Sequence, residues 1–432
     1  MEHDHLDAEI LERLLALDRT EEQNRSLLHQ IAVCRECRAV GGWLLDLHRS
    51  GALPRRFGVV EIALARSRAA APALWQKLER FPQEKRLALV RATRRFASWG
   101  LGELLCGKSL ETVPADAAQA AELAELAVSV ADAVEEEGGP AEDRWIYQLR
   151  ALAWAHLANA QRVGGGLPAA ERAFDMADSW WKAGAESIGD VLGYEPILLN
   201  LKASLRIAQR RFDEALGLLD EVAEIYRSGD AERRDSHLAG RALVQKSHAL
   251  IEMGETERAI AALREAETLI EPEREPRLLF CLRHDLAYCL ATAGRYMEAD
   301  ILLPDLWTVV QAHGSHLDAV RVRWVEARIV GGLGDGERAR QMLLTVQQEL
   351  LAAGIAYDAA LATLELAVLA LEADHTSQVK TLAAGLAPIF AAQGVTRETL
   401  ATLELFREAV RQETITADLA RRWLEELRRA AK

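Results

Sequence analysis

The feature that most constrains the fold is a small residue followed, twelve positions later, by another small or apolar residue. It occurs six times, as Ala158 and Ala170, Ala203 and Ala215, Ser247 and Ala259, Ala287 and Ala299, Ala327 and Ala339, and Ala367 and Val379. The first members of successive pairs lie 45, 44, 40, 40 and 40 residues apart. A period of about 20–50 residues is typical of a solenoid, in which each unit buries its apolar face only against its neighbours.

Each unit is predicted to be a helical hairpin with a tight turn. Five positions before the second small residue stand Gly165, Arg210, Gly254, Gly294, Gly334 and Asp374. Glycine there ends the first helix because it tolerates a positive φ. Four and seven positions after Ala259 come Leu263 and Ala266, a spacing that places apolar side chains on one face of a second helix. Only small side chains fit where two antiparallel helices cross closely, so each pair marks one crossing.

The small residues in both helices, the turn glycine and an aromatic shortly after it (Phe212, Tyr296) resemble the tetratricopeptide repeat, or TPR. The resemblance covers roughly residues 110–390. It departs from that family because the units are longer than 34 residues, most lack the aromatic of the first helix, and the closing proline is mostly missing. The resemblance implies an all-α, right-handed superhelical solenoid of TPR-like hairpins with long helices.

Outside the clear repeats, the sequence predicts two further helical parts. A helix over Glu84–Ser109 is expected to pair with a helix over Ala117–Ala133 as a degenerate first hairpin, and a helix over Thr416–Lys432 is expected to cap the array. We therefore predict a small helical domain at 1–60, a connector with the degenerate hairpin at 61–110, the array at 111–410 and a capping helix at 411–432.

The overall charge and composition exclude some functions. The formal net charge of −14 argues against an extended nucleic-acid surface, although it is compatible with a local basic patch. No stretch reaches eighteen uninterrupted apolar residues, so no membrane span is expected. The first residues are polar and acidic, without a signal peptide, and five irregularly spaced cysteines make no disulfide framework. We expect a protein of the reducing cytoplasm.

A candidate metal site lies in the N-terminal segment, where His29 is followed by Cys34 and Cys37. Two thiolates at i and i+3 can reach one Zn²⁺ from a helix start, and a nearby imidazole suits the same ion. His5, or alternatively His3, would supply the fourth ligand that structural zinc needs, with His48 as a lesser choice. The arrangement resembles the zinc-binding anti-sigma domain of bacteria, and this resemblance implies one structural zinc.

The segment departs from that pattern by one extra residue between His29 and Cys34. In one continuous helix these side chains would lie about 140° apart, so joint ligation requires a turn between them. The alternative interpretation is that Cys34 and Cys37 are a free, partly buried pair in a domain without metal.

The register of the repeats also predicts a binding groove, because the first helix of each TPR unit lines the inner surface. The inward polar and aromatic positions are Asn159, Asn200, Ser204, Arg241, His248, His284, Tyr288, Arg321, Trp324 and Arg328. Arginines, histidines and aromatics on one surface favour a carboxylate-bearing or acidic peptide partner. The alternative is an ordinary solvated helix face.

No catalytic motif stands in a context that would make it chemical, so we expect no enzyme. We interpret the chain as a non-enzymatic bacterial interaction scaffold or regulator. Its groove would bind protein or peptide partners, and by the anti-sigma resemblance its N-terminal helices would hold an effector such as a transcription factor. One alternative is a peptide- or ligand-sensing regulator like the quorum-peptide receptors built on TPR arrays. Another is an accessory subunit of an antiviral or protease effector complex.

Overall fold

The computed structural model describes residues 59–134, 143–188, 190, 192–228, 234–384, 397–411 and 413–430. Every regular element in these ranges is a helix, and none of the described residues is in a strand. The chain divides by packing into two compact units, with the boundary between Tyr194 and Glu195. The predicted all-α fold is confirmed, while the domain predicted for residues 1–60 lies outside the described residues except for the first two residues of α4.

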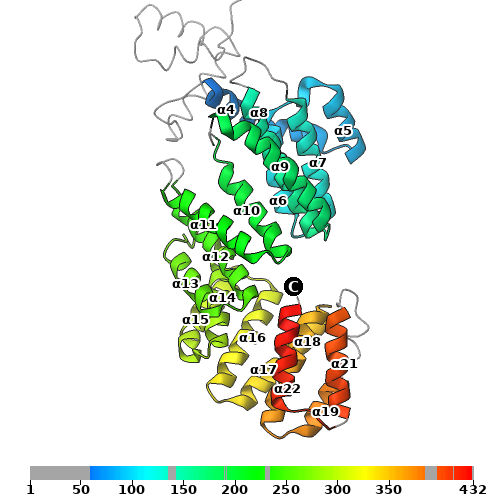
Figure 1. Ribbon diagram of the computed structural model, residues 1–432, viewed down its shortest axis with the longest axis vertical. Helices are drawn as coiled ribbons and strands as arrows, with labels where there is room; N and C mark the ends of the chain where they lie inside the picture. Colours follow the sequence, from blue (N-terminus) through cyan, green and yellow to red (C-terminus); the bar gives the residue numbers. More distant parts are fainter. Residues whose placement is uncertain are drawn as a thin grey trace, which may run out of the picture. The chain divides into compact units, whose positions relative to one another are not determined.

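The first unit contains the predicted degenerate hairpin and the first clear repeat. Its elements are α4 (Val59–Leu78), α5 (Gln83–Ala92), η1 (Arg94–Phe96), α6 (Trp99–Thr112), α7 (Ala117–Ala133), α8 (Asp143–Val163) and α9 (Leu167–Ile188). Helix α7 has the predicted bounds and packs against both α6 and α8 (Figure 1). Asp116 caps it, because its side chain accepts a hydrogen bond from the Gln119 N–H.

The single helix predicted over Glu84–Ser109 is wrong, because α5, η1 and α6 replace it. The chain becomes extended at Thr93, and Ser98 then caps α6 by accepting a hydrogen bond from the Leu101 N–H. Gly100, in the first turn of α6, allows a close contact with α4, because an added Cβ would lie 2.4 Å from the Ser67 carbonyl oxygen. The interruption between α5 and α6 is thus followed by a close contact between the α6 backbone at Gly100 and the α4 backbone at Ser67.

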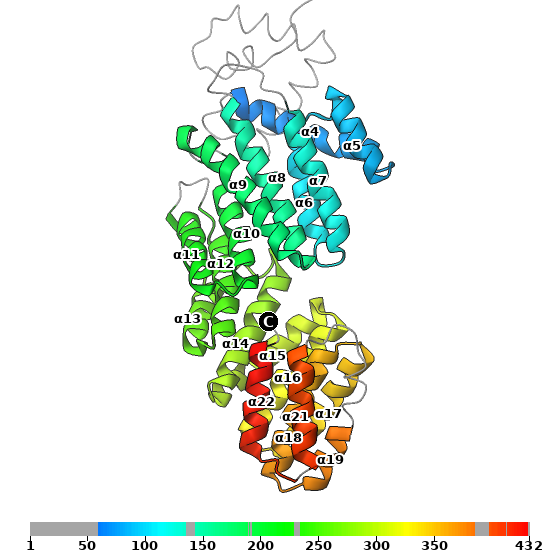
Figure 2. The same ribbon diagram turned by 45° about the vertical axis from the view of Figure 1, so that its right-hand side comes forward.

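The second unit is a run of hairpins followed by two closing helices. The hairpins are α10 (Glu195–Ala208) with α11 (Phe212–Ser228), α12 (Ser236–Met253) with α13 (Thr256–Glu267), α14 (Pro276–Thr292) with α15 (Tyr296–His313), α16 (His316–Gly332) with α17 (Gly336–Ala352), and α18 (Ala356–Glu372) with α19 (Thr376–Ala384). Within each hairpin the two helices pack together, and the first helices α12, α14 and α16 also touch in order (Figure 2). The repeat register predicted from the small pairs is confirmed.

The residues at the predicted crossings are almost completely buried. All twelve residues of the six pairs are at most 1% exposed. All six predicted turn residues have a positive φ, from 57° at Asp374 to 103° at Gly334. Arg210, at φ 60°, adopts this left-handed conformation despite its side chain, so the turn geometry is maintained even where glycine is absent.

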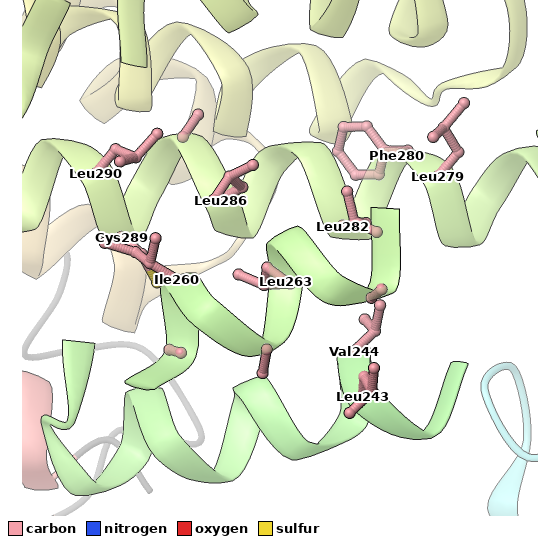
Figure 3. Close-up of a cluster of buried hydrophobic side chains, with 14 of the residues drawn as sticks. Leu243, Val244, Ile260, Leu263, Leu279, Phe280, Leu282, Leu286, Cys289 and Leu290 are labelled. Carbon is pink, nitrogen blue, oxygen red and sulfur yellow. The ribbon is translucent and has the colours of Figure 1, made fainter. Parts of the chain in front are cut away.

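The core runs through the array rather than collecting at one centre. Figure 3 shows one part of it, in which Val244 of α12, Leu263 of α13 and Leu286 of α14 belong to one cluster of buried side chains. Burying such a side chain contributes about 1.5–3 kcal/mol. Each hairpin therefore depends on the next for much of its stability.

The C-terminal end of the array is covered by α21 (Arg397–Arg411) and α22 (Ala417–Ala430). Helix α22 packs against α18 and α21, and its Trp423 meets Phe406 edge to face at 6.3 Å. This is the C-terminal helix expected over Thr416–Lys432. None of the described helices has both the length and the apolarity needed to cross a membrane.

Candidate functional site

Three of the predicted groove residues converge on the first helices of neighbouring repeats. Arg328 of α16 lies with its guanidinium 4.9 Å from the ring centre of Tyr288 on α14. The same guanidinium lies 5.2 Å from the ring of Trp324, one helical turn earlier. Cation–π contacts of this kind hold the arginine in one place between α14 and α16. The groove register therefore brings these three side chains together, as the sequence predicts.

A carboxylate that the sequence analysis missed completes this cluster. Glu365 of α18 accepts hydrogen bonds from the Trp324 Nε1–H at 2.9 Å and from the Arg328 Nε–H at 3.0 Å. The side chains of Arg328 and Glu365 are only 16% and 7% exposed. Burial lowers the pKa of Arg328, but the Glu365 charge outweighs it and the net pKa is raised. Arg328 is thus a buried, paired cation rather than a free one.

The two predicted histidines share a second carboxylate that the sequence analysis missed. His248 Nε2 lies 2.7 Å from Asp285 Oδ2, and His284 Nδ1 lies 3.0 Å from Asp285 Oδ1. Burial raises the pKa of Asp285, but the hydrogen bonds to both imidazoles more than compensate and hold it well below its usual range. The groove histidines therefore surround a fixed negative charge.

Both missed carboxylates follow the same sequence rule. Asp285 comes 37 residues after His248, and Glu365 comes 37 residues after Arg328. Because these repeats lie 40 residues apart, a residue 37 positions later lies on the first helix of the next repeat. It stands three residues, slightly less than one helical turn, before the position equivalent to the first residue. A search for opposite charges at this offset would have found both pairs.

The other groove positions lie in different surroundings. Arg241 is half exposed, 3.6 Å from Glu275. Arg321 is partly buried and forms no ion pair with any described residue. It lies near Asp358, whose pKa is raised by burial and lowered in part by Arg321.

The two predicted asparagines and Ser204 take no part in these charged clusters. The Gln245 amide donates to Ser204 Oγ at 2.7 Å and to the Asn200 carbonyl oxygen at 3.3 Å, which joins α12 to α10. Asn159 lies in the first unit, only 3% exposed, and its Oδ1 accepts from Arg162. Asn159 is therefore enclosed within the protein in this structure.

A cavity of about 460 Å³ opens beside the Arg328–Glu365 pair. It is lined by Ala291, Thr292, Tyr296, Ala327, Arg328, Gly331, Gly332, Leu343, Glu365, Val368, Leu369, Glu372, Arg421, Leu424 and Glu425. Its walls come mainly from α14, α16, α18 and α22, with Tyr296 of α15 and Leu343 of α17, and an Arg421–Glu372 ion pair joins α22 to α18. The volume falls within the usual range of ligand sites, about 300–1,000 Å³.

The predicted zinc ligands lie outside the described residues. They are His29, Cys34, Cys37 and His5, with His3 as the alternative. Within the described ranges no cluster of three or more His, Cys, Asp or Glu side chains could hold a metal ion. The metal prediction therefore concerns only the N-terminal segment.

No protein-family model matches this chain, and no curated protein matches it. Among solved structures it is similar to a Rap protein complexed with Competence and Sporulation Factor, at 12% identity and TM-score 0.52, over 77% of this chain and 88% of that one. The apo form of RapI matches at 12% identity and TM-score 0.47, over 77% and 98% of the two chains. The Rap conjugation gene regulator of plasmid pLS20, in complex with the Phr* peptide, matches at 12% identity and TM-score 0.39, over 77% and 97%. At this identity the first likeness supports the helical-repeat fold alone.

Proposed function

We propose that this chain is a non-enzymatic regulator of the bacterial cytoplasm that senses a short peptide in the second unit. The observation that carries the proposal is the cavity beside Arg328 and Glu365, which is bounded by three successive first helices and by α22. A concave site of this volume suits a short peptide better than a large flat protein surface, so the cavity favours peptide sensing over simple scaffolding. The fold neighbour complexed with Competence and Sporulation Factor supports the same choice.

The chemistry of the groove limits which peptide fits. Asp285 and Glu365 already partner His248 and Arg328, so a purely acidic peptide would meet fixed carboxylates as well as cations. We propose a peptide with apolar side chains for the cavity and one carboxylate for Arg321, which forms no ion pair with any described residue. This narrows the predicted acidic partner to a peptide of mixed polarity.

For the N-terminal segment we propose the role that the anti-sigma resemblance implies. Residues 1–60 would hold an effector protein such as a transcription factor, and one structural zinc on His29, Cys34, Cys37 and His5 would order them. Peptide binding in the second unit and effector binding at the N-terminus would then be two linked equilibria.

A pair of matched variants tests the peptide site. Thr292 lines the cavity, and Thr308 lies exposed on α15; each hydroxyl donates to the carbonyl four residues earlier. Short synthetic peptides would be screened by calorimetry against the full chain. For any peptide that binds, we expect Thr292→Trp to weaken binding about tenfold, or about 1.4 kcal/mol. Thr308→Trp should leave it unchanged. Equal effects of the two variants, or no binding peptide, would overturn the proposal.

A further inference from the structure

Positive charge is concentrated in one short stretch of this acidic chain. Between Lys77 and Phe96 the sequence has seven basic residues against two acidic ones, Glu79 and Glu84, a surplus of five. The basic residues are Lys77, Arg80, Lys85, Arg86, Arg91, Arg94 and Arg95. With a formal net charge of −14 for the whole chain, the remainder has −19. The stretch covers the end of α4, all of α5 and η1, at the edge of the first unit beside α7 (Figures 1 and 2).

Most cations of this stretch have no carboxylate partner among the described residues, although they lie close together in the sequence. In the second unit Arg264, Arg274 and Arg295 are each paired with a carboxylate at 2.7 Å or less. By contrast, no ion pair to a described residue is formed by Lys77, Arg80, Lys85, Arg86, Arg91, Arg95 or Lys108. Arg91 does act at longer range on Asp132 of α7, where it lowers a pKa that burial raises. The charge of this surface is therefore mostly available to a partner.

Aromatic rings lie beneath several of these cations. Arg86 of α5 and Lys108 of α6 both approach the Trp75 ring of α4, at 5.3 and 5.6 Å from its centre. Lys85 lies 4.3 Å from the Phe81 ring. The guanidinium of Arg86 is held in place, since its Nη2 donates to the Glu79 carbonyl oxygen. Aromatic rings and ordered cations together are typical of binding anchors in protein interfaces.

We propose that this surface, defined by Trp75, Lys85, Arg86, Arg91, Arg95 and Lys108, docks an acidic amphipathic helix of a partner protein. The carboxylates of that helix would face the exposed cations of α5 and η1, and its apolar side chains would lie along the lysine and arginine stems and the edge of Trp75. This site lies wholly in the first unit and does not depend on the peptide site of the second unit.

The dimensions of the surface favour a protein helix over nucleic acid. The ten residues of α5 extend about 15 Å, which matches two to three turns of a partner helix. The same length spans only about four base pairs of duplex DNA. A longer duplex would run beyond the basic residues onto a chain that is acidic elsewhere.

The test uses charge reversal on the full chain with a matched control. Lys85→Glu with Arg95→Glu changes two exposed cations of the surface, and Arg172→Glu with Arg258→Glu makes the same change in net charge on exposed positions of α9 and α13. The probes are a fluorescent synthetic helix of glutamate and leucine, and a duplex DNA of equal formal charge. Circular dichroism would check that all the proteins fold alike.

We expect the acidic helix to bind the natural chain with an affinity that falls as salt rises, because exposed charges are screened. The surface variant should bind it about tenfold more weakly, whereas the control should bind it within about twofold. The proposal is overturned if the helix does not bind at low salt, or if both variants lose affinity equally. It is also overturned if the DNA binds more tightly than the helix and loses its affinity in the surface variant.

Discussion

The buried ion pair between Arg328 and Glu365 offers a sharp test of how adjacent repeats hold together. Replacing Glu365 with Leu leaves the Arg328 guanidinium, whose side chain is 16% exposed, without its carboxylate. Breaking a buried pair from one side costs about 3–5 kcal/mol, because the remaining charge is desolvated and uncompensated. We therefore expect Glu365→Leu to destabilise the contact between α16 and α18 by this amount.

The double variant Arg328→Met, Glu365→Leu separates charge from packing. Apolar replacement of both partners is close to neutral in comparable buried pairs. One loss remains, because the Trp324 Nε1–H also donates to Glu365 and would be left without its acceptor, at about 1–3 kcal/mol. The single variant loses the same acceptor, so this cost is common to both, and the double variant should be more stable than the single variant by about 3–5 kcal/mol, the cost of the unpaired guanidinium.

Hydrogen exchange measured by mass spectrometry suits this prediction better than a global melting curve, since repeat arrays can open locally. Amides of α16 and α18 should exchange faster in Glu365→Leu, while those of α8 and α9 in the first unit serve as the internal control. The reasoning is refuted if Glu365→Leu leaves exchange in α16 and α18 unchanged, or if the double variant exchanges faster than the single one.

Three further predictions concern other parts of the chain. Because the pKa of Asp285 is lower in the folded protein than in the unfolded chain, its stabilising effect is complete above about pH 4 and is lost as the pH falls further; urea unfolding at pH 5 and at pH 3 should differ less in Asp285→Asn than in the natural chain. Ala287→Leu places a larger side chain at the fully buried crossing with Ala299, and we expect a loss of about 1–3 kcal/mol by urea unfolding, with no such loss for Thr308→Leu on the exposed side of α15. Metal analysis of the purified full chain should find one zinc per chain, and Cys37→Ser should abolish it; a natural chain without zinc would contradict the ligand set.

The hairpin register was predictable because helix crossings impose a local steric rule that repeats. Ala287 and Ala299 are both fully buried, and their spacing alone placed the turn at Gly294. Arg210 and Asp374 show that the rule is positional: both occupy the turn with positive φ although neither is glycine. Because the pattern repeats six times, the turn of each unit could be predicted even where the turn residue is not glycine.

The break within Glu84–Ser109 was not predictable from helical periodicity, because its cause is a tertiary contact. Gly100 must lie against the α4 backbone at Ser67, and a contact between segments 33 residues apart leaves no periodic signal. The Ser98 cap was the one local clue, since serine before an apolar run is a helix-start signal.

The sequence placed the predicted groove residues on the first helices of the repeats, where the structure has them, but it did not predict their carboxylate partners. Arginine and histidine positions were read one helix at a time, whereas their partners Asp285 and Glu365 lie on the next repeat. An ion pair between repeats depends on the offset between neighbouring helices, and that offset becomes visible only when charges are compared across units. Arg328 and His248 therefore looked available to a ligand although each already has a carboxylate partner on the next repeat.

This difference changes which variants can test ligand binding. Reversing the charge of Arg328 would place a carboxylate beside Glu365 in a buried position, so any loss of binding would include a loss of folding. Arg321 is partly buried and has no ion-pair partner among the described residues, and its charge acts on Asp358 of α18 without a hydrogen bond between them. If the groove recognises a peptide carboxylate, Arg321→Gln should weaken binding while the exchange of α16 and α18 stays unchanged. Arg328 and Arg321 both lie on α16, so variants of the two residues can separate the effect of an ion pair between repeats from the effect of a charge that binds a ligand.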